Sequence, residues 1–244
     1  MEQGISDQLG KVYIIGAGCG TADYLTLRAA KLLQQAEVLV YDALVDAEIQ
    51  QLVPARCDRI FVGKRGGQPS IKQSEIDQLL VHHCQQGKQI VRLKTGDPLI
   101  FGRTTSEIQA LKAADCRFEL IPGISSALAA PLFAAIPLTD LVLSKSFTVT
   151  SAHDPEILDW ATLSAIDTLV ILMGGRNLAT ILDRLLAHGK SAQSAIAIIQ
   201  WAGQPEQRIW TGTLADIGYQ TKGESLSPCV MVIGEVVRLR EFLA

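Results

Sequence analysis

Short apolar strands alternate with helical segments through the first half of the chain, and this alternation limits the possible folds more than any other feature. The pattern predicts strands at 11–15, 37–41, 59–62, 89–93 and 117–121, with helices at 25–35, 70–86 and 104–114. Such alternation places parallel strands in one sheet with helices on both faces. Ligands of such sheets bind at the carboxyl ends of the strands.

The rhythm changes after residue 121, where Pro122-Gly123 precedes a helix of small residues expected over 127–135. Less evenly spaced strands are predicted beyond it at 146–150, 168–173, 194–200, 207–211 and 228–233, with a helix at 178–188. We therefore expect an α/β protein of two domains. Residues 1–121 form a parallel sheet, residues 122–244 form a mixed sheet, and a cleft lies between them.

Composition excludes several classes of function. With 244 residues, of which 48% are hydrophobic, the chain can bury a substantial core. The formal net charge of -3 argues against a nucleic-acid partner, which usually requires a basic excess. Neither a secretory leader nor an apolar run of the roughly 20 residues that span a bilayer is present, so no membrane association is expected.

The cysteines and histidines favour a cytoplasmic protein without a metal. Five cysteines, an odd number without a C-x-x-C pair, indicate a reducing compartment. The adjacent His82 and His83 fall in a polar helical segment, where they are better explained as solvated side chains than as metal ligands.

A glycine loop follows the first strand, with Gly16, Gly18 and Gly20 at alternate positions. Glycines let a ligand approach the backbone, but Thr21 stands where a dinucleotide-binding fingerprint has its third glycine. A nucleotide loop and a turn shaped only for packing both remain open. Asp42, which ends the second strand, is a candidate proton acceptor, a ribose ligand or a helix cap.

Two further loops carry polar groups suited to a small ligand. Lys64 and Arg65 lie among glycines, an arrangement that suits carboxylates or phosphates, although a solvated basic loop is the favoured interpretation of this stretch taken alone. Residues 91–103, V-R-L-K-T-G-D-P-L-I-F-G-R, form a strand that enters a Gly-Asp-Pro turn. In this turn Gly96 permits close approach, and Asp97 is an acceptor for hydroxyl or amine donors.

These stretches together resemble the tetrapyrrole methylase superfamily over nearly the whole chain. The resemblance rests on V-Y-I-I-G-A-G-C-G (12–20), Y-D-A-L-V (41–45), V-G-K-R (62–65), residues 91–103, I-P-G-I-S-S-A (121–127), I-P-L-T (136–139), L-M-G (172–174), P-E-Q-R (205–208), T-G-T-L (211–214) and G-E-V-V (234–237). So many motifs in this order are far more specific than any one of them.

The resemblance implies a homodimer that binds S-adenosylmethionine and a tetrapyrrole and needs no metal. The cofactor contacts that it implies are Cys19, Thr95, Gly96, Asp97, Ile100, Ser125, Ser126, Met173 and Ala202. It also implies Asp42 as proton acceptor and Lys64 as proton donor, with Arg65 and Arg103 as ligands of substrate carboxylates. The implied activity is methylation of uroporphyrinogen III at C2 and C7 to give precorrin-2, on the route to sirohaem and cobalamin.

Several positions depart from the family pattern. Cys19 replaces a proline, Thr95 a glycine, Thr104-Thr105 a Gly-Gly pair and Asp140-Leu141 a His-Arg pair. Only Thr95 and the altered Asp140-Leu141 pair favour an alternative, a methyltransferase of a later corrinoid precursor. A nicotinamide-dependent oxidoreductase using Gly16 to Gly20 and Asp42, and a non-catalytic tetrapyrrole carrier, are the alternatives from other classes.

Overall fold

The computed structural model describes residues 9–63 and 71–244, which form two compact units, Met1–Ser125 and Ser126–Ala244. The sequence prediction placed the boundary between residues 121 and 122. Lys64 and Arg65, two of the predicted site residues, lie outside the described ranges.

Unit 1 is built on a five-stranded sheet of order β3-β2-β4-β1-β5, in which every neighbouring pair is parallel. Its strands are β1 (Lys11–Gly16), β2 (Val38–Tyr41), β3 (Asp58–Phe61), β4 (Gln89–Lys94) and β5 (Arg117–Ile121). The parallel sheet that the alternating pattern predicted is therefore confirmed.

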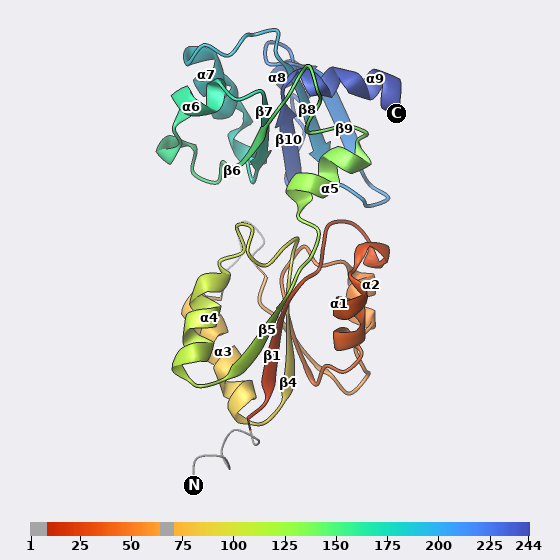
Figure 1. The fold of residues 1–244 in the computed structure, drawn as a ribbon, viewed down its shortest axis with the longest axis vertical. Coiled ribbons are helices and arrows are strands. Elements are labelled where there is room, and N and C mark those ends of the chain that lie inside the picture. The colour runs from red at the N-terminus through yellow and green to blue at the C-terminus, as the bar shows by residue number, and fades with distance from the viewer. Residues whose placement is uncertain (1–8, 64–70) are drawn as a thin grey trace. The chain divides into compact units, whose positions relative to one another are not determined.

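Helices cover both faces of this sheet (Figure 1). They are η1 (Ala22–Tyr24), α1 (Leu27–Leu33), α2 (Ala47–Gln51), α3 (Gln73–Gln85) and α4 (Thr104–Ala113). One apolar core contains residues of α1 and α2, and a second contains residues of α3 and α4. Neighbouring strand residues alternate between the two cores, as Ile14 and Ile15 do, because successive side chains of a strand point to opposite faces.

Unit 2 is built on a mixed sheet of order β6-β7-β10-β8-β9. β6 and β7 are parallel, and the other pairs are antiparallel. The strands are β6 (Phe147–Ser151), β7 (Thr168–Leu172), β8 (Ala195–Gln200), β9 (Arg208–Thr213) and β10 (Cys229–Ile233). The prediction of a mixed sheet is likewise confirmed.

The helices of unit 2 also pack on two faces. One core joins the sheet to α6, α7 and α8, and the other joins it to α5 and η4. The bounds are α5 (Ser126–Phe133), η2 (Pro155–Ile157), α6 (Trp160–Ser164), η3 (Gly175–Asn177), α7 (Leu178–Ala187), α8 (Ile217–Gln220), η4 (Glu235–Leu239) and α9 (Arg240–Leu243). Alanines on α5 let its backbone approach the sheet closely, as Ala127 and Ala130 are buried there, and Ala134 directly after the helix is buried too.

All five cysteines fall in the described ranges, and none of them is in a disulfide. Within residues 9–63 and 71–244, every helix is too short or too polar to cross a bilayer. The same ranges contain no group of three or more His, Cys, Asp or Glu side chains arranged to hold a metal ion.

The core of unit 2 supplies a test of the fold. Leu169 lies on β7 and is completely buried, so Leu169→Ala should lower the free energy of unfolding by about 2–5 kcal/mol. Leu141→Ala is the control, because Leu141 is 93% exposed and should change stability by less than about 0.5 kcal/mol. All three tryptophans, Trp160, Trp201 and Trp210, lie in unit 2, so their fluorescence during urea unfolding reports on this unit. Equal losses in the two variants would contradict the described core.

Candidate active site

Three loops meet at the carboxyl edge of the parallel sheet in unit 1. The loops after β1 and β4 are joined by backbone hydrogen bonds in both directions, from Gly18 N to Gly96 O (3.1 Å) and from Gly96 N to Gly18 O (2.9 Å). A Cβ atom on Gly16 would lie 2.5 Å from both Gly123 N and Gly96 O. The three loops can approach this closely because glycine has no side chain.

The backbone at Gly18 is buried, and an added Cβ would meet its neighbours at ordinary van der Waals distances. Its φ is +77°, and the nearest atom to an added Cβ would be Tyr24 O at 3.5 Å. Burial raises the pKa of the neighbouring Cys19 thiol to about 11, so this side chain is uncharged at neutral pH. The loop therefore places a neutral thiol beside a backbone that is fixed by the loop after β4.

Asp97 fixes the Gly-Asp-Pro turn. Its Oδ1 accepts a hydrogen bond from Leu99 N (2.9 Å), and its Oδ2 accepts a longer one from Gly123 N (3.4 Å). The carboxylate thus holds the loop after β4 against the loop after β5. Because each carboxylate oxygen has two lone pairs, Asp97 retains capacity for a ligand donor beside these backbone contacts.

The loop that follows exposes three consecutive apolar side chains. Leu99 is 60% exposed, Ile100 45% and Phe101 48%, which is unusual for a run of large apolar residues in one loop. The loop closes where the buried Thr104 hydroxyl donates to Pro98 O. Arg103, the residue before α4, is exposed and has a left-handed backbone with φ of +55°.

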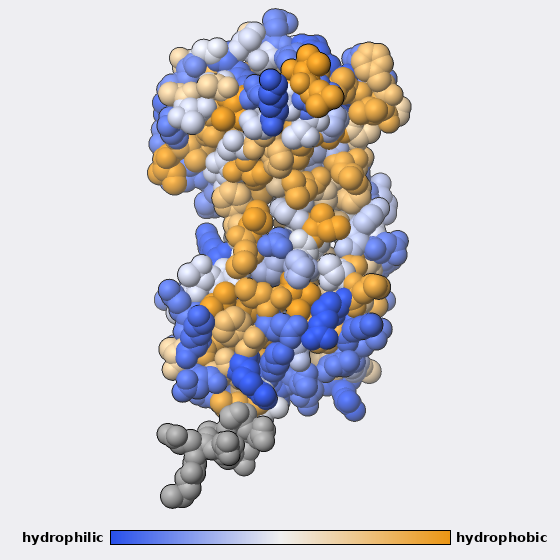
Figure 2. Space-filling model, in the orientation of Figure 1, coloured by the Kyte–Doolittle hydropathy of each residue, from blue (hydrophilic) through white to orange (hydrophobic). Residues whose placement is uncertain are grey.

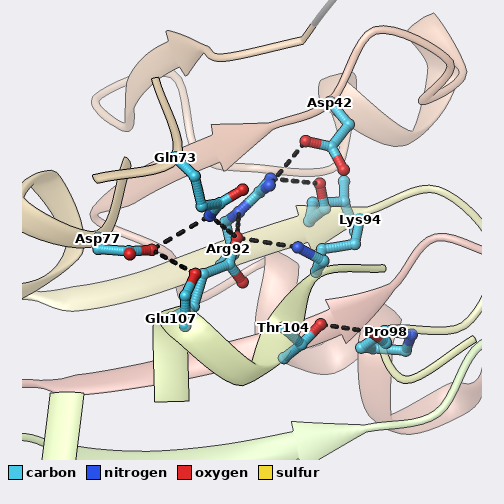
Figure 3. A network of polar contacts seen from close by, with 10 residues as sticks. Asp42, Gln73, Asp77, Arg92, Lys94, Pro98, Thr104 and Glu107 are labelled. Carbon is cyan, nitrogen blue, oxygen red and sulfur yellow. Dashed lines mark hydrogen bonds and ion pairs between the residues drawn. The ribbon is translucent and has the colours of Figure 1, made fainter. Parts of the chain in front are cut away.

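A network of charged side chains lies beneath this edge (Figure 3). Glu107 of α4 is fully buried, and its Oε1 accepts from Arg92 Nε (3.0 Å) and from Lys94 Nζ (2.8 Å). Arg92 NH2 also pairs with Asp42 Oδ1 at 2.7 Å. These four residues hold two positive and two negative charges, so the buried cations are compensated.

Strand geometry explains why these residues meet. On β4, Ile90 lies in the core on the side of α3 and α4, so Arg92 and Lys94, two and four residues later, point to the same side. On β2, Val40 lies in that core too, and Asp42 follows it by two residues. The alternation therefore brings the cations of β4 and the carboxylate after β2 to one face.

Burial acts strongly on this network. Only 2% of Arg92 and 2% of Lys94 is exposed. Burial is the main cause that lowers the pKa of Lys94, and the nearby Arg92 lowers it further, while Glu107 opposes this shift. Charges at such depth require partners, because desolvation of an unpaired ion costs several kcal/mol.

Asp42 occupies the exposed end of the network. Its side chain is 29% exposed, and its backbone N–H donates to Leu93 O at 3.2 Å. The N-cap of the following helix, α2, is Asp46. Asp42 is therefore not the cap of that helix, which was one of the alternatives for this residue.

Three predicted contacts lie in unit 2. β7 and β8 are each antiparallel to β10, so their carboxyl ends lie at the same edge of the sheet. Met173 follows β7 with φ of +57°, and Trp201, directly before Ala202, follows β8 with φ of +50°. Left-handed backbone at non-glycine residues costs of order 1–3 kcal/mol and often occurs at functional sites.

The third predicted contact in unit 2 is Ser126, and the helix α5 packs it close to the mixed sheet. Ser126 begins α5, and the next residue, Ala127, shares an apolar core with Leu172 and Ala202. In unit 1, by contrast, Cys19, Thr95, Gly96, Asp97, Ile100 and Ser125 all lie on the loops after β1, β4 and β5. Each unit thus gathers its own predicted residues at one sheet edge.

The sequence interpretation missed Arg92, Lys94 and Glu107 as members of the network. A signal was present, because two cations at alternate positions of a largely apolar strand must share one face. Their partner was hidden, since Glu107 comes from α4 and nothing in its local pattern marks it as buried.

Comparison with known proteins identifies the family. Residues 11–218 match the model of the Tetrapyrrole (Corrin/Porphyrin) Methylases. The chain belongs to this family.

Named tetrapyrrole methylases resemble the chain over most of its length. It is 54% identical to a uroporphyrinogen-III C-methyltransferase of Synechococcus elongatus, over 96% of this chain and 97% of that one. It is 42% identical to siroheme synthase 1 of Pectobacterium atrosepticum, covering 96% of this chain but 50% of that protein.

A solved structure shares the fold of these methylases. Uroporphyrin-III C-methyl transferase of Thermus thermophilus, complexed with S-adenyl homocysteine, superposes with a TM-score of 0.82 at 34% identity. The match covers 94% of this chain and 100% of that one.

The close approach of the loops predicts a severe effect of a single methyl group. Gly16→Ala should lower the free energy of unfolding by more than about 1 kcal/mol, because the new Cβ would meet backbone atoms that no side-chain movement can relieve. Gly218→Ala is the control, since its Cβ would meet its nearest neighbour, Leu182 Cδ1, at an ordinary 3.5 Å. Thermal unfolding followed by circular dichroism measures both, and equal stabilities would refute the described contact.

Proposed function

We propose that the chain uses S-adenosylmethionine to methylate uroporphyrinogen III at C2 and C7, giving precorrin-2 for sirohaem and cobalamin synthesis. The observation that carries this proposal is the 54% identity to a uroporphyrinogen-III C-methyltransferase over almost the full length of both chains. The edge of unit 1 supports it independently, since it combines loops fixed by backbone contacts, exposed apolar side chains and a fixed carboxylate.

The residues at this edge suit S-adenosylmethionine. The loops after β1 and β4 are held at fixed positions, and the neutral Cys19 thiol and the exposed Ile100 suit an adenosine moiety. The carboxylates of Asp42 and Asp97 favour a sulfonium cation. The proposed contacts are Cys19, Thr95, Gly96, Asp97, Ile100 and Ser125 in unit 1, and Ser126, Met173 and Ala202 in unit 2.

In the proposed reaction, the chain mainly positions the methyl donor and the macrocycle and transfers protons. Bound S-adenosylmethionine supplies a methyl carbon already activated by positive sulfur, so the proposal requires no metal. Methylation leaves positive charge on the macrocycle, which the Asp42 carboxylate stabilises. Asp42 then takes a proton from a carbon of the macrocycle that bears hydrogen. The electrons of the broken carbon–hydrogen bond neutralise the positive charge on the ring.

Three cations are proposed to act on the tetrapyrrole substrate. Lys64 is the proposed proton donor, and Arg65 and Arg103 are proposed to bind the carboxylates of the substrate. The exposed Arg103 is available for this role within the described part of the chain. Lys64 and Arg65 fall outside that part, and their roles rest on the family pattern.

A later corrinoid precursor is the second candidate substrate. Asp140 stands where the family pattern has histidine, and its Oδ1 accepts from Val142 N (2.8 Å) and Leu143 N (2.9 Å). It therefore builds a local turn and leaves no cation for substrate carboxylates. Membership of the tetrapyrrole methylases removes the main reason to consider a nicotinamide-dependent oxidoreductase.

We also propose a homodimer in the cytoplasm. Unit 2 has an apolar groove of about 460 Å³ lined by residues that include Leu128, Pro131, Leu132 and Leu243. Leu132 is 72% exposed, and hydrophobic side chains reach the surface around α9 (Figure 2). A second copy of the chain would cover such a surface, so sedimentation should give a dimer mass, whereas a monomer at micromolar concentration would count against it.

An anaerobic assay with methyl-labelled S-adenosylmethionine tests the activity. The protein should transfer two labelled methyl groups to each uroporphyrinogen III. Label found only in a later corrinoid precursor would support the second candidate, and no transfer to any tetrapyrrole would refute the proposed activity.

The role of Asp42 gives a sharper prediction. Asp42→Asn keeps the size of the side chain but removes its capacity to take a proton, so turnover should fall about 100-fold or more. Its dissociation constant for S-adenosylhomocysteine, measured by calorimetry, should stay within about twofold, because the loops around Gly18 and Gly96 are unchanged. Equal losses of binding and turnover would show that Asp42 acts on structure.

A further inference from the structure

The guanidinium group of Arg92 is fixed by acceptors from three parts of unit 1. Its Nε donates to Glu107 Oε1 on α4 at 3.0 Å, its NH1 donates to Leu93 O on β4 at 3.2 Å, and its NH2 pairs with Asp42 Oδ1 after β2 at 2.7 Å. A planar group held at three nitrogens cannot rotate without breaking at least one of these contacts. Arg92 is therefore a rigid support for the Asp42 carboxylate.

The ion pair between Arg92 and Asp42 is formed through Oδ1 of the carboxylate. No hydrogen bond or ion pair among the residues that the structure describes uses Asp42 Oδ2. Because the side chain is 29% exposed while Arg92 is buried, the carboxylate is anchored from below and reachable from outside. The contact fixes one oxygen and leaves the other available.

Glu107 holds Arg92 in this position. Its Oε1 accepts from Arg92 and Lys94, and from Gln73 Nε2 at 3.4 Å. Its Oε2 is buried without a hydrogen-bond partner among the described residues. Glu107 therefore anchors Nε of Arg92, while the NH2 group of the same guanidinium pairs with Asp42.

We propose that Arg92, held by Glu107, is a positioning residue that orients the Asp42 carboxylate so that Oδ2 faces the proton it accepts. The inference rests on the proposed role of Asp42 as proton acceptor. Carbon loses the proton, the bonding electrons stay in the macrocycle, and the proton forms a bond to Oδ2 of Asp42. Arg92 neither gains nor loses a proton in this step.

The Arg92→Met variant suits a test because the remaining buried charges stay balanced. Lys94 and Glu107 still form their 2.8 Å ion pair, and Asp42 reaches solvent. Methionine also fills much of the volume of the arginine stem. The variant should therefore fold, and circular dichroism and thermal unfolding check this.

The expected result is a selective loss of turnover. Arg92→Met should lower kcat by about 10- to 100-fold, the scale of a misplaced catalytic group. The KM for S-adenosylmethionine and the dissociation constant of S-adenosylhomocysteine should stay within about twofold. Arg117→Met is the matched control, because Arg117 binds Leu9 O at the opposite edge of the sheet and its loss should leave kcat unchanged.

A double variant separates this inference from the proposed function. If Arg92 acts through Asp42, adding Arg92→Met to Asp42→Asn causes no further loss of kcat. An Asp42→Asn variant with normal turnover would overturn both the proton-acceptor role and the inference. A low Asp42→Asn turnover, combined with additive effects or with an unimpaired Arg92→Met variant, would overturn the inference alone.

A second substitution covers the case in which Arg92→Met does not fold. Arg92→Gln keeps a hydrogen-bond donor in the network and should show the same loss of kcat and the same lack of additivity. Failure of both variants to fold would assign Arg92 to the stability of unit 1 and overturn the positioning role.

Discussion

The contact of three backbone segments at Gly16, Gly96 and Gly123 determines how the polar groups of unit 1 are arranged. The loops after β1, β4 and β5 approach so closely that a Cβ on Gly123 would lie 2.3 Å from Gly96 O. Asp97 closes the same junction through Gly123 N. Because these loops are fixed by backbone contacts, the edge can present a ligand with backbone groups at defined positions.

The network of Asp42, Arg92, Lys94 and Glu107 supplies the charged groups beside these loops. Arg92 and Lys94 are buried on a strand that also carries Ile90, Val91 and Leu93, and Glu107 compensates them from α4. Arg92 also pairs with Asp42, which is the more exposed of the two carboxylates in the four-residue network. A site built in this way combines a fixed acceptor with a surface of neutral and apolar groups, which suits a cationic methyl donor and an electron-rich ring.

Much of the fold was predictable because it follows from local patterns. Alternation of strands and helices gave the parallel sheet, and the uneven spacing beyond Pro122 gave the mixed one. The helices α2 and α6 were missed, since each has only five residues and too few turns to show a helical period. The resemblance on which the site prediction rested also came from motifs of contiguous residues.

The parts of the site that escaped prediction depend on tertiary contacts. The sequence marks Asp97 as a polar group on a turn but does not reveal that its two oxygens accept from Leu99 and Gly123. Likewise, Glu107 has no local sign that it pairs with β4, and Asp42 has none that a buried arginine binds one of its oxygens. Contacts between elements distant in sequence decide these roles.

The central claim is that the edge of unit 1 is built to bind a sulfonium nucleoside. Calorimetric titration of the purified chain with S-adenosylhomocysteine, the demethylated form of the proposed donor, tests it most directly. One molecule should bind saturably to each chain, whereas a folded protein that shows no binding at millimolar concentration would mean that this edge is not a nucleoside site.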